Sequence, residues 1–112
     1  MELVLTTYRL AAKLPLAERF ALGAQLRRSA ISIPSNIAEG HAGGPRRRYL
    51  HHMRIAVGSL AELDTQVEIA RRLEFVTSDD VAVVVEQLAV TGRLLHALAQ
   101  ALRKTPVSSD SP

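Results

Sequence analysis

The sequence contains no cysteine and no tryptophan, and aromatic residues make up only 4 % of its 112 residues. Without cysteine, disulfide bonds and thiolate metal sites are excluded, and a reducing compartment is expected. Hydrophobic residues still account for 47 % of the chain, so we expect one domain with a core of Ala, Leu and Val. Because the first residues lack a basic start followed by an apolar run, no secretory signal is predicted and we expect a cytoplasmic protein.

Strand-like alternation of apolar and polar residues is also missing, and apolar residues recur instead at helical steps of three and four. Three breaks divide this pattern into four segments, namely Pro15, His41–Pro45 and Thr77–Asp80. Helices are expected at about Glu2–Leu14, between Pro15 and His41, from Pro45 to about Leu73, and from an N-cap at Ser78 to Leu102. The expected fold is an all-α, antiparallel four-helix bundle over residues 1–104, followed by a flexible tail at residues 105–112.

Pro34 lies in the middle of the second segment, within SAISIPSNIAEG at Ser29–Gly40. An apolar stripe keeps helical phase across it, formed by Leu22, Leu26, Ala30, Ile33 and Ile37. A polar stripe beside it does the same, formed by Gln25, Ser29, Ser32, Asn36 and Glu39. Because neither stripe slips, we expect Pro34 to kink a continuous helix and not to end it.

The polar stripe has a counterpart in the third segment, formed by Ser59, Glu62 and Gln66. We expect the two stripes to face each other, or to face a neighbouring subunit, through a hydrogen-bonded seam. The small residues Gly58 and Ser59 favour such a close approach of helices. The alternative is that each stripe is simply solvated.

The last segment is apolar on more than one face, because only Glu86 and Arg93 are charged between Val81 and Leu102. A membrane span is disfavoured, since each charge would cost about 2.5–3.5 kcal/mol near the bilayer centre. We therefore expect one face of this helix to meet the bundle core and another to meet a second copy of the chain. This pattern predicts a homo-oligomer and no membrane partner.

Arginine dominates the positive charge, since only Lys13 and Lys104 are lysines and the net charge is +3. The strongest cluster is His41–Arg54, which contains no acid. Three consecutive arginines at a helix start oppose the helix dipole, so a polyanion or an acidic partner would explain them. The candidate nucleic-acid-binding residues are Arg46, Arg47, Arg48, His51, Arg54, Arg27 and Arg28, with Arg71 and Arg72 as lesser contributors. Such binding would be largely independent of sequence and sensitive to salt, whereas the competing interpretation is a solvated cationic face.

The histidines do not form a metal-binding pattern. His51 and His52 are adjacent and point about 100° apart on a helix, so both cannot ligate one ion in the usual way. His41 and His96 supply no helpful spacing. We expect no metal and no cofactor.

Catalytic constellations are equally weak. Ser35, His41 and Asp64 could be named as a triad, but no nucleophile elbow or oxyanion hole accompanies them. Glu39 and Glu62 could form a carboxylate pair, although small bundles use such acids structurally far more often. We expect no catalytic residues and no enzymatic activity.

Two motifs carry a family resemblance: LRRSAISIPSNIAEG at Leu26–Gly40 and YLHHMRIAVGSLAELDTQVEIARRL at Tyr49–Leu73. With these motifs the chain resembles, from about Thr7 to Leu102, the 23S rRNA-intervening-sequence proteins, a family that includes the accessory protein of diversity-generating retroelements. The resemblance implies an up-down-up-down bundle that assembles into a homopentamer. It implies no catalytic residues, while the retroelement branch binds nucleic acid and a reverse transcriptase.

The resemblance also assigns structural roles. The motif positions that match as fold or assembly determinants are Ser35, Asn36, Glu39, Gly40, Ser59, Glu62 and Asp64, to which the helix argument adds Pro34. The chain departs from the family where Arg48 replaces the usual acid and His52 an expected Phe, which makes this region more basic.

Two functions remain open at this point. The leading one is a non-enzymatic oligomeric scaffold that binds nucleic acid, accessory to an RNA-processing or reverse-transcribing partner. The alternative is a protein-interaction module without a nucleic-acid role, whose basic rim meets an acidic protein.

Overall fold

The structure, a computed structural model, describes residues 1–104. The elements are α1 (Glu2–Ala12), a short 3₁₀ helix (Leu16–Glu18), α2 (Leu22–His41), α3 (Arg46–Arg72) and α4 (Ser78–Lys104). No strand occurs between residues 1 and 104, so the expected all-α class and the four helices are confirmed. The predicted flexible tail lies outside the described residues.

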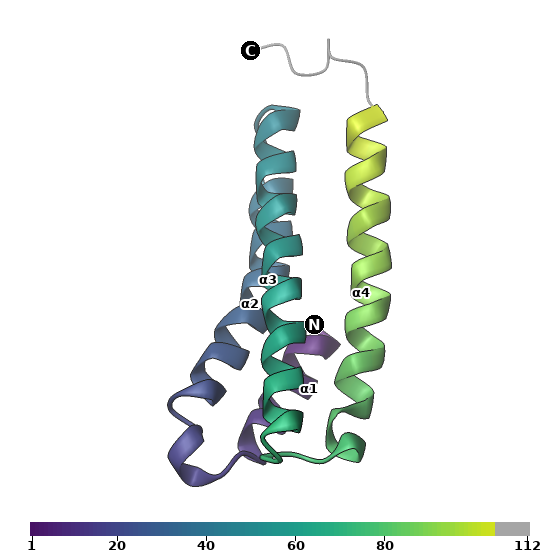
Figure 1. The fold of residues 1–112 in the computed structure, drawn as a ribbon. Helices are drawn as coiled ribbons and strands as arrows, with labels where there is room; N and C mark the ends of the chain where they lie inside the picture. Colours follow the sequence, from purple (N-terminus) through teal and green to yellow (C-terminus); the bar gives the residue numbers. More distant parts are fainter. Residues whose placement is uncertain (105–112) are drawn as a thin grey trace.

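The helices differ in length, and this difference divides the bundle into two halves (Figure 1). The helices α3 and α4 each span 27 residues, whereas α1 spans only 11. The helix α1 packs against α2 and α4, and α3 packs against α2 and α4. The short α1 therefore covers only the half that holds the start of α2 and α4 and the end of α3. The other half consists of α2, α3 and α4 alone.

The core follows the helical repeat of the sequence. Fully buried side chains come from successive turns of the helices and include Leu26, Met53, Leu63 and Leu95. Burial of each such side chain contributes about 1.5–3 kcal/mol relative to exposure. Thr7 is also fully buried, and its hydroxyl donates to the Leu3 carbonyl at 2.7 Å. This bond lets a polar residue occupy a core position of α1.

Pro34 lies inside α2, which runs without interruption from Leu22 to His41. The expectation that the helix continues through this residue is confirmed. The kink at Pro34 and the up-down-up-down order of the bundle stay predictions.

The N-cap of α4 differs from the predicted one. The cap is Thr77 and not Ser78, since the Thr77 hydroxyl accepts the Asp80 N–H at 3.1 Å. In return, the Asp80 carboxylate accepts the Thr77 N–H at 2.9 Å, which completes a capping box. Lys13 pairs with the same carboxylate at 3.1 Å and ties the end of α1 to α4. These contacts, the Thr77 N–H first and Lys13 next, lower the pKa of Asp80.

The exposed side of α4 is strongly apolar. By length and composition alone, α4 would be long and apolar enough to cross a membrane, and it is the one such helix among residues 1–104. Only 22 % of its most apolar stretch is buried within this chain. Val83, Val90 and Leu94 lie at steps of seven and four and are each more than half exposed. Much of the apolar surface of α4 therefore has no cover from its own chain.

Candidate functional site at the basic end of the bundle

One end of the molecule carries almost all of the unbalanced positive charge. We call this end, formed by residues 39–61 and 87–104, the basic end. Here the end of α2, the start of α3 and the end of α4 meet (Figure 1). The basic end holds seven Arg and Lys residues and a single acid, Glu39, whereas the rest of the described chain holds seven Arg and Lys and nine acids. The charges are thus sorted along the length of the bundle.

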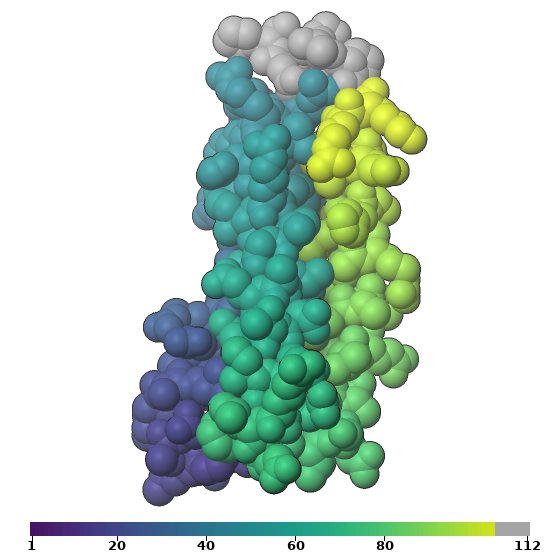
Figure 2. Space-filling view, in the orientation of Figure 1, coloured from purple at the N-terminus to yellow at the C-terminus, as the bar shows by residue number. Residues whose placement is uncertain are grey.

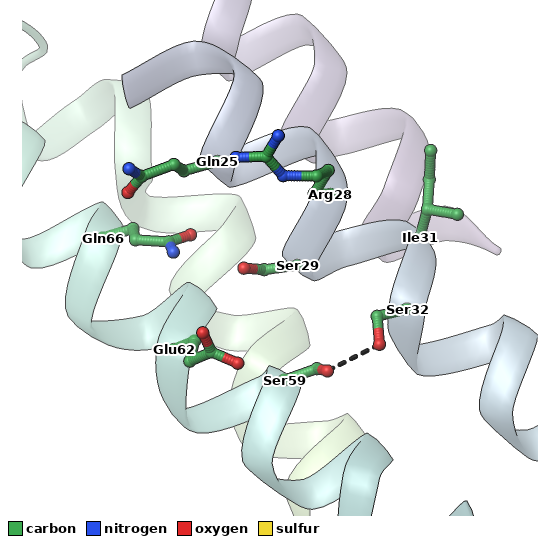
Figure 3. A pocket seen from close by; sticks show the side chains of 8 residues that line it. All are labelled: Gln25, Arg28, Ser29, Ile31, Ser32, Ser59, Glu62 and Gln66. Carbon is green, nitrogen blue, oxygen red and sulfur yellow. Dashed lines mark hydrogen bonds between the residues drawn. The ribbon is translucent and has the colours of Figure 1, made fainter. Parts of the chain in front are cut away.

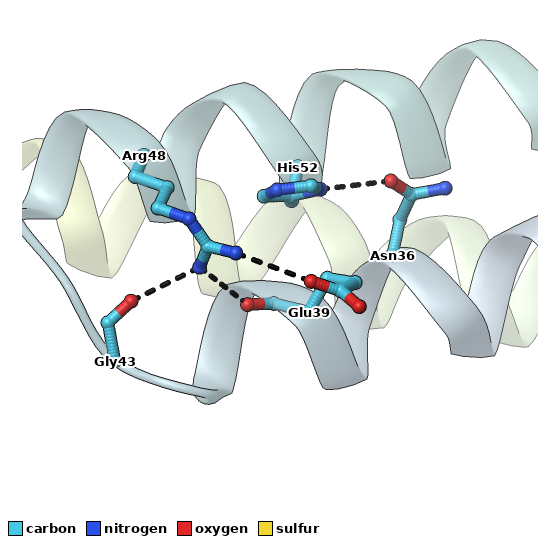
Figure 4. A network of polar contacts seen from close by, with 5 residues as sticks. All are labelled: Asn36, Glu39, Gly43, Arg48 and His52. Atoms are coloured by element: carbon cyan, nitrogen blue, oxygen red, sulfur yellow. Dashed lines mark hydrogen bonds and ion pairs between the residues drawn. The ribbon is translucent and has the colours of Figure 1, made fainter.

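The turn between α2 and α3 builds one side of this end (Figure 4). Gly43 and Gly44 have φ angles of 117° and 103°, a backbone conformation that favours glycine. Arg48 closes the turn, since its Nη1 donates to the carbonyls of Glu39 at 2.6 Å and Gly43 at 3.0 Å. Its Nη2 pairs with the Glu39 carboxylate at 3.1 Å. Arg48 therefore neutralises the one acid of the basic end and caps α2.

Arg46 has a related structural contact. Its Nη1 donates to the Leu102 carbonyl at 3.2 Å, close to the end of α4. This bond joins the first residue of α3 to the last turn of α4 across 56 positions of sequence. Arg46 and Arg48 thus hold the three helix ends together.

The remaining cations of the basic end point to solvent. On α3, Arg47, His51 and Arg54 lie at steps of four and three, so they share one exposed face. On α4, Arg93 is exposed, as are Arg103 and Lys104 in the last turn. None of these six side chains has a hydrogen bond or ion pair to another residue within 1–104. The five Arg and Lys side chains among them are the charges available to an outside ligand.

The other predicted arginines lie elsewhere. Arg27 donates to the Arg19 carbonyl at 3.2 Å, and its guanidinium lies 6.0 Å from the centre of the Tyr8 ring. Arg28 lies on the second turn of α2, in the half that contains α1. The structure therefore does not bring Arg27 and Arg28 together with Arg46–Arg54.

The lesser candidates Arg71 and Arg72 lie at the far end of α3 and pair with Glu68. Hydrogen bonds from Arg71 first and from Arg72 next lower the pKa of Glu68. These two arginines are thus balanced by an acid of their own helix.

The two polar stripes face each other across α2 and α3 (Figure 3). The Ser59 hydroxyl donates to the Ser32 hydroxyl at 2.7 Å, so the predicted hydrogen bond between the stripes is present within one chain. A groove of about 640 Å³ opens beside this pair, and it is lined by polar residues that include Gln25, Glu62 and Gln66. Glu62 makes no hydrogen bond within residues 1–104 and lies at this groove.

The seam continues towards the basic end (Figure 4). The Asn36 amide donates to the carbonyl and hydroxyl oxygens of Ser32 at 2.8 and 3.1 Å. Its Oδ1 therefore accepts a hydrogen bond from His52 Nδ1, at 2.9 Å. The residue that replaces an expected Phe is thus a member of the polar seam.

Other motif residues have separate positions. Gly40 allows α2 to approach α3, since a Cβ there would lie 2.9 Å from Cδ1 of Tyr49. Ser35 is exposed, and Asp64 lies at a groove between α3 and α4. His41 contacts the Tyr49 hydroxyl through Nε2 at 2.8 Å. Within residues 1–104 no group of three or more His, Asp or Glu side chains is placed to hold a metal ion.

The fold and the charge distribution define a small helical-bundle protein with one strongly cationic end. The family model described as 23S rRNA-intervening sequence protein matches residues 1–97, so the chain belongs to this family. A crystal structure of a protein with unknown function, from the S23 ribosomal protein family of Bacteroides thetaiotaomicron, is similar with a TM-score of 0.75. The similarity covers 86 % of this chain and 87 % of that one at 21 % identity, which establishes a shared fold. No curated protein matches the chain.

Proposed function

We propose that this protein is a non-enzymatic, cytoplasmic scaffold that binds nucleic acid through its basic end. The observation that supports this proposal is the sorting of charge. Seven Arg and Lys residues share the end with one acid, and that acid is paired with Arg48. Arg47, Arg54 and Arg103 are exposed and available to phosphate oxygens. Arginine suits such contacts because its guanidinium can donate two hydrogen bonds to one phosphate.

We also propose that the scaffold is a homo-oligomer, with the pentamer favoured by the family resemblance. The exposed apolar stripe of α4, formed by Val83, Val90 and Leu94, supports association of copies. Repetition of the basic end around a ring would increase the cationic field and the number of phosphate contacts. A reverse-transcribing or RNA-processing partner would use such a ring as a platform for its nucleic acid.

The nucleic-acid proposal is tested by charge removal at matched positions. One variant carries Arg47→Gln, Arg54→Gln and Arg103→Gln, and the control carries Arg9→Gln, Arg28→Gln and Arg72→Gln in the other half. Fluorescence anisotropy with labelled RNA and DNA should show weaker binding for the first variant only. Its slope of log affinity against log salt should fall by about 2–3, since each lost phosphate contact removes roughly 0.7–0.9.

Three results would contradict this proposal. If the parent protein binds neither RNA nor DNA at physiological salt, the alternative function, a module that binds an acidic protein, is favoured. Equal losses in the two variants would show that the basic end is not the site. An unchanged salt slope in the first variant would show that its arginines do not contact phosphates.

The assembly proposal has its own test. Leu94→Glu should break the oligomer, whereas Ile31→Glu, an exposed apolar residue of α2, serves as the control. Sedimentation at fixed protomer concentration would measure the mass of the assembly for both variants. A Leu94→Glu protein of unchanged mass would contradict the use of this stripe.

A further inference from the structure

The basic end contains a small hollow between α3 and α4, which lie side by side along the molecule (Figure 2). Its volume is about 140 Å³. The floor is apolar and is formed by Leu50, Met53, Val57 and Ala99, of which Met53 and Ala99 are almost fully buried. The rim is cationic or titratable and is formed by Arg54, His96 and Arg103. The hollow therefore joins an apolar surface to positive charge.

The helix registers explain why this hollow exists. On α4, His96, Ala99 and Arg103 lie at steps of three and four, so the small Ala99 stands between two long side chains on one face. One turn earlier, Gly92 lets α4 lie close to α3, since a Cβ there would be 3.3 Å from Leu60 Cδ2. Because α1 is confined to the other half, it contributes no side chain to the hollow.

Size and charge together indicate the chemistry of a ligand. An apolar protein cavity of roughly 150 Å³ holds a benzene molecule, so this open hollow can receive one face of a flat ring. Two exposed arginines from different helices flank the same space and suit a phosphate group. Carboxylates would repel such a ligand, and residues 40–61 and 87–104 contain none. A flat ring joined to a phosphate is the structure of a nucleotide.

We propose that the hollow holds one base of a single-stranded nucleic acid, with the adjoining phosphate on Arg54 and Arg103. This inference rests on the proposed function and specifies its substrate class. A duplex keeps its bases paired within the stack, so it could contact the arginines but not the floor. The strand would extend over Arg47 and His51, because these share the exposed face of α3 with Arg54.

The strand is not expected to run the other way along the same two helices. A second groove adjoins the hollow at Val57 and His96 and continues towards Asp64. The Asp64 carboxylate would repel phosphates there. Charge therefore gives the bound strand a direction away from the half that contains α1.

Abasic strands separate contact with the base from contact with the phosphates. The affinity of the full chain is measured for a labelled single-stranded oligonucleotide and for an abasic strand of equal length and charge. The normal strand should bind about fivefold more tightly, because covering roughly 40 Å² of the aliphatic floor contributes about 1 kcal/mol. A double variant, Leu50→Ala with Val57→Ala, should bring this ratio close to 1. The affinities of this variant for the abasic strand and for a duplex should match those of the parent.

Two further variants complete the test. Leu16→Ala with Leu73→Ala truncates exposed apolar residues outside the basic end and should preserve the ratio. Arg54→Gln with Arg103→Gln should weaken normal and abasic strands by the same factor. Unchanged binding of the abasic strand also shows that the Leu50→Ala, Val57→Ala protein is folded.

The possible failures are distinguishable. If normal and abasic strands bind the parent equally, the hollow holds no base, although the scaffold still binds nucleic acid. A ratio that persists in the Leu50→Ala, Val57→Ala variant also overturns the inference, because the base contact then lies elsewhere. If neither strand binds, the proposed function fails and this inference fails with it.

Discussion

The hydrogen bond between Ser59 and Ser32 provides a direct test of how α2 and α3 are held together. Ser59 is 5 % exposed and donates to the Ser32 hydroxyl at 2.7 Å. In Ser59→Ala the Ser32 oxygen keeps Asn36 as a donor, so the loss is that of one neutral hydrogen bond, about 0.5–1.5 kcal/mol. In Ser32→Ala the buried Ser59 hydroxyl loses its acceptor, and the cost rises to about 1–3 kcal/mol.

The double variant separates this interaction from the effects of the single changes. Removing both hydroxyls leaves neither one stranded, so Ser32→Ala with Ser59→Ala should cost about 1 kcal/mol less than the sum of the single variants. Urea unfolding at fixed protomer concentration measures all four proteins, and about 1 kcal/mol moves the midpoint by roughly 0.3–1 M. The control cycle pairs Ser59 with the exposed Ser35 and should be additive. A coupling free energy below about 0.3 kcal/mol between Ser32 and Ser59 would refute the assigned bond.

Three further predictions concern the helix ends. Arg48→Gln should lower the free energy of unfolding by about 1–2 kcal/mol because it removes the cap of α2, whereas Arg47→Gln should stay within about 0.5 kcal/mol; equal effects in urea unfolding would contradict this. Gly44→Ala should cost at least about 1 kcal/mol because its φ is 103°, and an unchanged unfolding midpoint would contradict the strained turn. The pKa of Asp80 is lowered in the folded state, so its contribution to stability is present above about pH 4 and is lost as the pH falls through the folded value. Asp80→Asn should therefore lose less stability than the parent between pH 6 and pH 2 in urea unfolding, and equal losses in the two proteins would contradict this linkage.

The sequence was sufficient to predict the helices and much of their contact. The three- and four-residue spacing of apolar side chains is what a buried helix face requires. Phase continuity across Pro34 predicted an unbroken α2 because a break would have displaced one stripe from the other. Because both polar stripes keep helical phase, they face each other between α2 and α3. Glu39, however, pairs with Arg48 and not with a residue of the polar stripe on α3.

The composition of the candidate site was harder to predict. Arg103 and Lys104 lie about 50 positions from Arg54, and only the arrangement of α3 and α4 brings them to one end. A signal was nonetheless present, because both contributing segments are almost free of acids. The N-cap of α4 at Thr77 was not predicted, for a different reason. Thr77 and Ser78 both suit an N-cap, and the choice depends on which of them can exchange hydrogen bonds with Asp80.

The arginine run at the start of α3 shows why site residues must be separated from structural ones. Three cations at a helix N-terminus oppose its dipole, but the negative ends of α2 and α4 lie at the same end of the bundle. Arg48 bonds to the last turn of α2 and Arg46 to the last turn of α4, so each has a favourable position. No outside polyanion is needed to explain these two residues.

A different set of charges is therefore available to an outside ligand. Arg47, Arg54 and Arg103 are exposed and unpaired within residues 1–104, and no nearby carboxylate offsets them. These three, together with Arg93 and Lys104, should change the salt dependence of binding, whereas loss of Arg48 should change stability. If substitution of every arginine changed both the salt dependence of binding and the free energy of unfolding, the arginines would act as one patch. That result would contradict the separate structural contacts of Arg46 and Arg48.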